Sequence, residues 1–479
     1  MYVSTRSKER VSASYAIIKG LASDGGLFVP EKIGQIGFNS NWLGYSYNEV
    51  AFLIFREFLD DFSEDEIREV INKAYSKENF AGGVIGGKFF DNISFLSLYN
   101  GPTFAFKDVA LTILPLLMEK ALKKNNNTNK TVILTATSGD TGSASMSGFS
   151  NTNIKTIVLY PNNGVSKLQE AQMLSLSKNG SCALAVNGNF DDCQRIVKEV
   201  FEKVKVDKVN LASANSINIG RLIPQIVYYF YHYLECVRNN KIKLGDKINY
   251  VVPTGNFGNI LAGFYAKSLG VPINVLVCAS NKNDVLTEFF NSGVYDKNRE
   301  FYKTMSPSMD ILVSSNLERY LYYLASCDNK EVTQLMKELK EKGVYTVSSK
   351  LMRNNKDIVS KSASEEETLK AIEEVYTKYN HLIDPHTAVG YAVYKKESLK
   401  GYTVIVSTAS PFKFVNVYKD LFSLSGQDDF SNIKELSKKS NTIVDERILS
   451  LESVKKEKEV IDKEDVIDRI VGTLWKKLR

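Results

Sequence analysis

The sequence predicts an α/β protein in which a mostly parallel sheet is flanked by helices. The first observation behind this prediction is that, from about residue 131, short β-branched runs alternate with amphipathic segments of helical period. The second is that glycine-rich turns stand between several of these runs and the helical segments that follow. Both patterns are typical of strand–turn–helix units repeated along a chain.

The predicted elements follow one another through most of the chain. The runs that we expect to be strands are TVILTAT (131–137), TIVLY (156–160), CALAVNG (182–188), NLASA (210–214), INYVVPT (248–254), INVLVCAS (273–280) and YTVIVSTA (402–409). Helices are expected from Asp191 to about Val204 and from Ile219 onward, where the apolar residues take the helical period.

The two ends of the chain depart from this alternation. In residues 1 to about 95, GLASDGGLFVP predicts turns and a short strand, while SYNEVAFLIFREFL and SEDEIREVINKAY predict two amphipathic helices. We therefore expect an N-terminal domain. The final 35 or so residues, rich in Lys, Glu and Asp with spaced Ile and Val, are typical of a solvent-facing terminal helix.

The composition is that of a globular protein of several domains, with 479 residues, 43% hydrophobic and 24% charged. The net charge of +6 is not gathered into a basic stripe, so nucleic acid is not an expected partner. Five widely spaced cysteines without a Cys-x-x-Cys pair indicate neither a disulfide framework nor a zinc site, which favours a reducing, cytoplasmic setting. No secretory signal or membrane span is predicted, so we expect a soluble protein with no membrane partner.

Three turns stand out because each follows a predicted strand and precedes a helical segment: TSGDTGSA (137–144), PTGNFGN (253–259) and the weaker STASPF (407–412). In an open parallel sheet such turns lie at the carboxyl ends of the strands, where ligands bind. Glycine allows close backbone approach, and N–H groups at a helix start hold phosphate or carboxylate. Each turn alone is equally compatible with a plain connection, but two on one sheet suggest a ligand with two anionic ends.

Neither of the first two turns is a Walker A loop or the G-x-G-x-x-G dinucleotide fingerprint, so a nucleotide cofactor is not favoured. The histidines also give no metal signal, because His232, His381 and His386 lie far apart and show no ligand spacing. We expect no metal site. His232 is interpreted as a core or interface residue, and His386, in DPHTAVG, is a candidate neighbour of the site.

Lys107 lies in an unusually apolar segment, GPTFAFKDVALTILPLL, where Phe104, Phe106, Val109 and Ala110 flank it. A lysine amine kept away from water there would have a lowered pKa and could form a Schiff base with a carbonyl compound. A single lysine is more often a solvated side chain, so this local context does not decide between the two interpretations.

Considered together, these segments resemble the threonine synthase family, pyridoxal-phosphate enzymes of fold type II related to tryptophan synthase β chains. The likeness runs nearly end to end. In order, it rests on STR (4–6), GLASDGGLFVP (20–30), GPTFAFKDVA (101–110), TSGDTGSA (137–144), GNFDDCQ (188–194), NSINIGR (215–221), PTGNFGN (253–259), PSMDILVSSNLER (307–319), DPHTAVG (384–390) and TASPFKF (408–414).

The resemblance implies two open, mostly parallel-sheet domains with helices on both faces, together with an N-terminal domain. The expected boundaries are 1–95 for the N-terminal domain, 96–215 for a smaller α/β domain carrying Lys107 and the TSGDTG loop, 216–445 for a larger domain that binds pyridoxal 5'-phosphate (PLP), and 446–479 for a C-terminal helical extension.

The resemblance also implies roles for individual residues. Lys107 would form the Schiff base with PLP and move protons at Cα and Cβ of the substrate. The cofactor phosphate would be wrapped, mostly by backbone N–H groups, by Gly255, Asn256, Phe257, Gly258 and Asn259. Thr408 would bond the pyridine nitrogen, and such a hydroxyl partner does not enforce a protonated ring.

The substrate would be held by two further groups of residues. The residues expected at its carboxylate are Thr137, Ser138, Gly139, Asp140 and Thr141. The residues expected at its phosphate are Asn215, Ser216, Asn218 and Arg221, of which the arginine supplies the natural forked partner.

The implied activity is that of a lyase that converts O-phospho-L-homoserine and water to L-threonine and phosphate, in a monomer or homodimer. Alternatives remain: a threonine-synthase-like phospho-lyase would release 2-oxobutyrate and ammonia instead, and a non-catalytic member would only bind a metabolite or a partner. A serine or threonine dehydratase is less favoured, because it would leave an anion site containing Arg221 without use.

The sequence departs from the family pattern in a few places. Ser410 stands where a histidine is expected in a TAHP-type motif, Tyr99 and Asn100 replace a usual Phe-His pair before GPT, and Ser7 replaces a usual glycine. Ser410 follows the expected ring contact closely, and a serine keeps hydrogen bonding but lacks a titratable imidazole.

Overall fold

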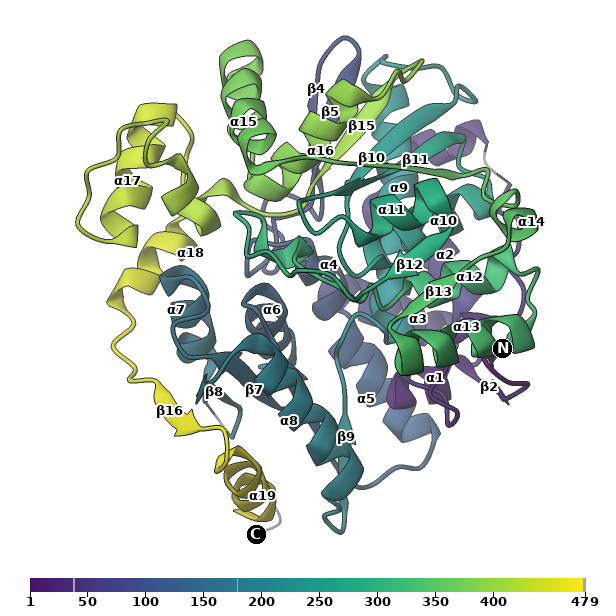
Figure 1. The fold of residues 1–479 in the computed structure, drawn as a ribbon, viewed down its shortest axis with the longest axis vertical. Coiled ribbons are helices and arrows are strands. Elements are labelled where there is room, and N and C mark those ends of the chain that lie inside the picture. The colour runs from purple at the N-terminus through teal and green to yellow at the C-terminus, as the bar shows by residue number, and fades with distance from the viewer. Residues whose placement is uncertain (38, 179, 477–479) are drawn as a thin grey trace.

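The computed structural model describes residues 1–37, 39–178 and 180–476. Two α/β sheets dominate these residues, and in Figure 1 the smaller one, in blue, lies below the larger one, in teal and green. The α/β class with helices on both faces of parallel sheets is confirmed.

The larger sheet has six strands, of which β4 and β5 pair antiparallel while the other neighbours are parallel. In spatial order they are β14 (Ile358–Ser362), β11 (Ile273–Ser280), β10 (Ile248–Pro253), β15 (Thr403–Ser407), β5 (Ile93–Ser97) and β4 (Gly86–Phe89). Every residue of β10 and β15 is buried, which is why these strands are continuous apolar runs in the sequence.

Helices cover both faces of this sheet. Tyr250 and Val252 of β10 belong to the same core as α9 and α10, whereas Val251 between them packs in the core formed with α16 on the opposite face. The helices of this part of the chain are α9 (Ile219–Arg238), α10 (Gly258–Leu269), α11 (Val285–Ser292), η2 (Pro307–Met309), α12 (Leu317–Leu324), α13 (Asn329–Lys342), α14 (Ser349–Met352), α15 (Glu365–Tyr379), α16 (Pro385–Lys396), η3 (Pro411–Tyr418) and α17 (Asp429–Ser440). A two-stranded ribbon, β12 (Val294–Asp296) with β13 (Val344–Thr346), lies beside them.

The smaller sheet is parallel throughout and has five strands. In spatial order they are β16 (Glu459–Asp462), β8 (Cys182–Asn187), β7 (Lys155–Pro161), β6 (Lys130–Ala136) and β9 (Val209–Ala212). Its helices are α4 (Lys107–Leu111), α5 (Leu114–Lys124), α6 (Asp140–Phe149), α7 (Lys167–Leu176), α8 (Phe190–Lys203) and α19 (Val466–Lys476).

The N-terminal part combines a small sheet with helices that pack against α9. Its elements are β1 (Tyr2–Ser4), β2 (Arg10–Val11), α1 (Ala13–Lys19), β3 (Phe28–Pro30), η1 (Ser40–Gly44), α2 (Tyr47–Phe58) and α3 (Glu64–Ala74). The two predicted amphipathic helices are confirmed as α2 and α3. Each begins with a capping box, formed by Ser46 with Glu49 and by Ser63 with Glu66, which satisfies N–H groups of the first turn.

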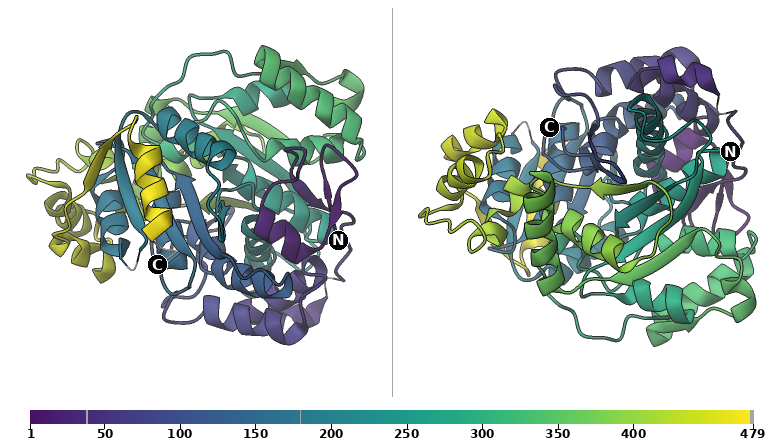
Figure 2. Two further views of the ribbon diagram at one scale, coloured as in Figure 1. Left: turned by 90° about the horizontal axis from the view of Figure 1, so that it is seen from below. Right: turned by 90° about the horizontal axis from the view of Figure 1, so that it is seen from above.

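The end of the chain differs from the expected single solvent-facing helix, and that expectation was wrong. After α18 (Glu446–Leu449) and η4 (Ser450–Ser453), β16 pairs with β8, and α19 buries Val466, Ile470 and Leu474 in the core of the smaller sheet. Figure 2 (left) shows this strand and helix in yellow beside the blue strands. The spaced Ile and Val residues of the segment were core positions.

Two further observations bear on the organisation of the chain. The expected boundary after residue 95 falls inside β5, and β4 and β5 both belong to the larger sheet, so the exact domain limits stay a prediction. Across the ranges given above, none of the helices combines the length and the apolar character needed to cross a membrane.

Candidate active site

The predicted site residues lie at the carboxyl ends of strands from both sheets. In the larger sheet, the segment 101–106 that leads to Lys107 follows β5, the PTGNFGN turn follows β10, and Thr408 follows β15. TSGDTG follows β6 and Ser213–Arg221 follows β9 in the smaller sheet. The candidate site therefore lies between the two sheets, and the contacts below join the segments to one another.

A tight turn immediately before α4 sets the position of Lys107. The buried carboxylate of Asp108 accepts hydrogen bonds from the backbone N of Thr103 (2.8 Å) and from its Oγ1 (2.6 Å). A Cβ on Gly101 would lie 2.4 Å from the Cβ of Asp108, so this close approach requires glycine. The turn thereby folds back on the first turn of the helix that begins at Lys107.

Two backbone hydrogen bonds tie this turn to the end of β15. Phe106 N donates to Thr408 O (2.8 Å), and Ser410 N donates to Phe104 O (3.0 Å). The segments thus form a short antiparallel pairing. As a result, the residue after Phe106, which is Lys107, lies beside Thr408, the residue predicted to contact the cofactor ring.

Lys107 faces a carboxylate in the interior. Its Nζ lies 3.4 Å from Oδ2 of Asp140, and the two side chains are only 12% and 4% exposed. Burial lowers the pKa of Lys107, and the like charges of Lys413 and Arg221 lower it further, while Asp140 acts in the opposite direction. The net effect is a pKa below the ordinary lysine value, which makes the amine a better nucleophile near neutral pH.

Asp140 is surrounded by donors. Its Oδ1 accepts from Nζ of Lys413 (2.7 Å) and Nε2 of Gln169 (2.8 Å), and its Oδ2 accepts from Lys107 and from Oγ of Ser308 (3.3 Å). Burial acts to raise the pKa of Asp140, but Lys413 and Lys107 outweigh it and hold the pKa well below the ordinary value. The side chain is therefore an anion with its acceptor positions filled, and it does not offer a contact for a substrate carboxylate.

The TSGDTG turn is shaped by its own threonine and glycine. Thr137 Oγ1 accepts from the backbone N of Gly139 and of Gly142, both at 2.9 Å. Gly139 has φ +133°, and a Cβ there would lie 2.3 Å from the side-chain oxygen of Gln169. The half-buried side chains of Ser138 and Thr141 lie on the same turn. Thr137 therefore has a structural role in the turn, whereas Ser138 and Thr141 are the predicted carboxylate contacts not yet accounted for.

The PTGNFGN turn has an unusual backbone. Phe257 adopts φ +63°, and α10 starts at Gly258 without a side-chain hydrogen-bond cap among the described residues. A Cβ on Gly255 would lie 2.9 Å from the backbone O of Ser308, and Ser314 Oγ donates to Gly255 O (2.7 Å). The turn thus leaves N–H groups at a helix start free for an anion. Ser308 also links this turn to Asp140.

The two asparagines of this turn are held differently. Oδ1 of Asn259 accepts from the hydroxyls of Tyr228 (2.5 Å) and Tyr229 (2.9 Å), while its Nδ2 is buried without a hydrogen-bond partner in the described chain. Asn256 Oδ1 accepts from Ser315 Oγ (3.2 Å). An unpaired buried donor next to an uncapped helix start is consistent with a missing acceptor at this turn.

The segment before α9 reaches the same region through Ser216. Its Oγ lies 3.4 Å from Oγ of Ser315, the residue that also contacts Asn256. Asn215 Oδ1 accepts from Thr135 Oγ1 at 2.8 Å. Ser216 is therefore close to the PTGNFGN turn, and Asn215 is close to the end of β6.

Asn218 and Arg221 differ in whether their side chains keep a hydrogen-bonding group without a partner in the described chain. Asn218 accepts from Gly220 N (2.9 Å) and donates to Ile17 O (2.8 Å), so its amide caps α9 and ties it to α1. Arg221 is 2% exposed, and its Nη1 donates to Ala214 O (2.6 Å), but its Nε has no hydrogen-bond partner in the described chain. Burial lowers the pKa of Arg221 to about 10. Arg221 therefore has a donor available for a ligand, whereas the side-chain amide of Asn218 is already engaged.

Sequence reasoning missed three side chains of this group, Lys413, Gln169 and Ser308, which all contact Asp140. The signal for Lys413 was a lysine between two phenylalanines directly after the TASP turn. Gln169 gave no signal of its own, because it lies in the first turn of α7 as part of a capping box with Ser166.

The predictions for two histidines can be compared with their surroundings. His232 is fully buried, stacks on Phe89 and contacts Ser94 Oγ (3.0 Å), and burial lowers its pKa to about 3, which confirms a core residue. His386 Nε2 accepts from the backbone N of Ser308 (3.1 Å), so it is adjacent to a residue that contacts Asp140. Its Nδ1 lies 2.7 Å from Asp384, which fixes the ring.

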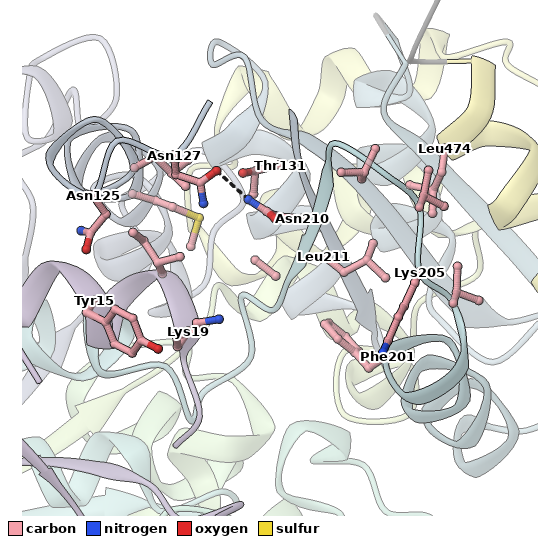
Figure 3. A pocket seen from close by; sticks show the side chains of 17 residues that line it. Tyr15, Lys19, Asn125, Asn127, Thr131, Phe201, Lys205, Asn210, Leu211 and Leu474 are labelled. Atoms are coloured by element: carbon pink, nitrogen blue, oxygen red, sulfur yellow. Dashed lines mark hydrogen bonds between the residues drawn. The ribbon is translucent and has the colours of Figure 1, made fainter. Parts of the chain in front are cut away.

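A separate groove of about 660 Å³ lies away from these residues, between α1, α5, α8 and β9. Figure 3 shows Tyr15 and Lys19 on one side of it and Phe201 and Lys205 on the other. None of the predicted site residues is among the described residues that line it. The groove therefore plays no part in the arrangement around Lys107.

Comparison with known proteins agrees with this geometry. The family model "Threonine synthase N terminus" matches residues 1–75, and the model "Pyridoxal-phosphate dependent enzyme" matches residues 92–410. The chain is 38% identical to a threonine synthase of Schizosaccharomyces pombe over 469 residues, which covers 90% of each protein. It is also 38% identical to threonine synthase-like 1 of Homo sapiens, covering 86% of this chain and 59% of that protein.

A solved structure shares the fold over the whole chain. The PLP-bound threonine synthase from Brucella melitensis superposes with a TM-score of 0.87 at 33% sequence identity, covering 98% of this chain and 99% of that one. The fold is thus that of type II PLP enzymes, and a lyase dependent on this cofactor is established. The chain belongs to the threonine synthase family, and pyridoxal 5'-phosphate is its cofactor.

Proposed function

We propose that the chain converts O-phospho-L-homoserine and water to L-threonine and phosphate, the last step of threonine biosynthesis. The observation that supports this most is a buried, low-pKa lysine that shares its surroundings with two separate places for an anion. One is the uncapped start of α10, and the other is the buried Arg221 with its unpaired Nε. A cofactor phosphate and a substrate phosphate need two such places.

The residues present fit a cofactor that carries an aldehyde and a phosphate. Lys107 supplies a buried amine, Gly255 leaves no room for a side chain, and Asn259 has a buried Nδ2 in need of an acceptor. We propose that Lys107 holds PLP, that residues 255–259 surround its phosphate, and that the Thr408 hydroxyl bonds its ring nitrogen. When bound, PLP supplies an electron sink that stabilises carbanions beside the substrate nitrogen.

The chain itself then positions the substrate and moves protons. Lys107 takes the proton from Cα and transfers protons at Cβ, because its amine stands at the junction of the two sheets. Arg221, with Asn215 and Ser216, binds the phosphate that leaves from Cγ. We leave Asn218 out of this group, because its amide is engaged with α1 and α9.

The substrate carboxylate is assigned to the N–H groups and hydroxyls of Ser138 and Thr141. These groups stand at the start of α6, where the helix dipole favours an anion. The carboxylate of Asp140 serves instead as the counter-charge of two lysines. In this assignment the turn holds the substrate through its N–H groups and hydroxyls, and glycine at position 139 leaves the space that the side chain of Gln169 occupies.

The test is incubation of the purified chain with O-phospho-L-homoserine, with threonine and phosphate measured together. We expect both products in equal amounts. Release of phosphate with 2-oxobutyrate in place of threonine would refute the proposal in favour of a phospho-lyase.

Lys107→Ala tests the role of the lysine directly. We expect this variant to lose the visible absorption band that borohydride bleaches in the wild type, together with product formation. Lys370→Ala is the control, because the Lys370 side chain is 71% exposed and pairs with Glu366 on the surface of α15. A variant at position 107 that retained the band would contradict the assignment.

We further propose a cytoplasmic location, a monomer or homodimer, and the four-part division with limits near residues 95, 215 and 445. The location is supported by the five cysteines, which are all free thiols in the structure. The division is supported by core clusters that belong to one sheet each, although a further cluster joins residues of both sheets.

A further inference from the structure

A second buried lysine lies in the site, and it has no role in the reaction proposed above. Lys413, in η3, has a side chain that is 0% exposed. Its Nζ donates to Asp140 Oδ1 (2.7 Å) and to the backbone O of Thr103 (2.6 Å). Burying an ammonium group is costly unless it is paired and hydrogen-bonded, and both conditions are met here. Lys413 therefore joins the turn before Lys107 to the start of α6.

The two lysines share one carboxylate unequally. Lys413 makes the shorter contact with Asp140, at 2.7 Å against 3.4 Å for Lys107, and has the additional carbonyl of Thr103. Arg221 adds a further positive charge on the α9 side. Asp108 is a second buried carboxylate, and it attracts Lys413 and Arg221. With both lysines protonated, Lys107 would share Asp140 with a closer cation in a dry interior, so one proton is readily lost. The weaker contact of Lys107 makes it the group that loses the proton.

We propose that Lys413 is a positioning residue that keeps Lys107 uncharged, by serving as the permanent partner of Asp140 and by repelling a proton from the neighbouring amine. The charged groups that face Lys107 come from three elements: Asp140 from α6, Arg221 from α9 and Lys413 from η3. The lowered pKa of Lys107 has burial as its largest cause and agrees with this arrangement. The inference deepens the proposed function, since it rests on Lys107 as the reactive amine.

The first test is a pH titration of the full-length holoenzyme by visible absorption, which reports whether the nitrogen of Lys107 linked to the cofactor carries a proton. In Lys413→Met we expect the midpoint to rise by about one pH unit or more, because a repelling charge is lost while Asp140 remains. Asp140→Asn should lower the midpoint. The double variant Lys413→Met/Asp140→Asn should return toward the wild-type midpoint, and Lys413→Arg, which keeps the charge, should stay near it.

A second test does not require the cofactor to bind. The full chain, freed of cofactor, is treated with limiting acetic anhydride at a series of pH values, and acetylation of Lys107 is measured by mass spectrometry against the exposed Lys370. The pH at which acetylation of Lys107 is half-maximal should be raised in Lys413→Met and lowered in Asp140→Asn. It should stay near the wild-type value in Lys413→Arg and in the double variant. Retained thermal unfolding cooperativity shows that each variant is folded.

The outcomes separate this inference from the proposed reaction. An unchanged or lowered midpoint in Lys413→Met, or an equal shift in Lys413→Arg, would overturn the role of Lys413 even if the chain makes threonine. A raised midpoint would support it even if the product is 2-oxobutyrate, because neither measurement depends on the product.

Discussion

The two glycine-rich turns of the site look alike in sequence but are built on different principles. The TSGDTG turn carries a charged residue, Asp140, whose oxygens face Lys107 and Lys413. The PTGNFGN turn has no charged side chain and is shaped by backbone constraints, with Phe257 at φ +63° and no space for a Cβ on Gly255. The first turn contributes an anion, the Asp140 carboxylate. The second turn contributes hydrogen-bond donors that have no acceptor within the described chain.

This difference separates two kinds of evidence for ligand binding. At the first turn the side chain of Asp140 is engaged by protein donors, so the position of this side chain is explained without a ligand. At the second turn an uncapped helix start and the unpaired Nδ2 of Asn259 call for an added anion. Variants at Asp140 should therefore act mainly on stability and proton affinity, and variants in the second turn mainly on cofactor binding.

The largest effect is expected for Asp140→Asn. It removes the carboxylate that the ammonium of Lys413, which is 0% exposed, contacts directly, and such losses cost about 3–5 kcal/mol of unfolding free energy. Urea unfolding at pH 7 measures this. Adding Lys413→Met should recover much of the loss, because the second buried charge then also disappears. A double variant no more stable than Asp140→Asn would show that the pair does not couple.

A smaller effect on a different property is expected for Gly255→Ala. The new Cβ would meet the backbone O of Ser308 at 2.9 Å, and overpacking of this kind costs about 1–3 kcal/mol. If the strain is relieved by displacing the turn, PLP affinity falls by about tenfold to hundredfold, which a spectroscopic titration measures. Gly44→Ala is the matched control, because nothing lies within 4 Å of a Cβ at Gly44. Equal affinities for the two variants would contradict the assignment of the turn.

The smallest effect is a difference in pH dependence between the two turns. Because the folded-state pKa of Asp140 lies below that of an unfolded aspartate, about 3.9, its contribution to stability is complete above that value and is lost as the pH falls toward the folded pKa. The stability gap between wild type and Asp140→Asn should therefore narrow as the pH falls from about 4 to about 2, by at most about 1.4 kcal/mol per pH unit.

The gap between wild type and Gly255→Ala should stay constant over the same range, because the PTGNFGN turn contains no titratable side chain. Urea unfolding of all three proteins at each pH provides the comparison. Parallel narrowing of both gaps would mean that groups elsewhere dominate the acid response.

The fold was predictable to the extent that its strands are buried. Several inner strands are apolar runs that can be recognised in the sequence, namely β6, β7, β10, β11 and β15. Sequence reasoning missed the edge strands β14 and β16, which expose part of their residues. An edge strand of this length has too few buried positions to show a clear period. It also missed β4 and β5, and β5 is an exception, because it is an inner strand with every residue buried that lies before the alternating part of the chain.

The site was predictable where its residues stand in a distinctive local sequence. Lys107 and the two turns stand in such a sequence, with apolar flanks and with glycines. Gln169 and Ser308 do not, because each reaches Asp140 only through the packing of distant elements, α7 and η2. Lys413 was overlooked because a lysine is ordinarily a solvated residue, and only tertiary structure reveals that its amine is enclosed.

The strand β16 has a consequence for how the protein matures. It pairs with β8, a strand 275 residues earlier in the chain, and α19 completes the core beneath that sheet with Ile470 and Leu474. A nascent chain therefore completes the smaller sheet only after residues 459–474 have left the ribosome, long after the other strands of that sheet. Until then, the edge of β8 stays open to association with other chains.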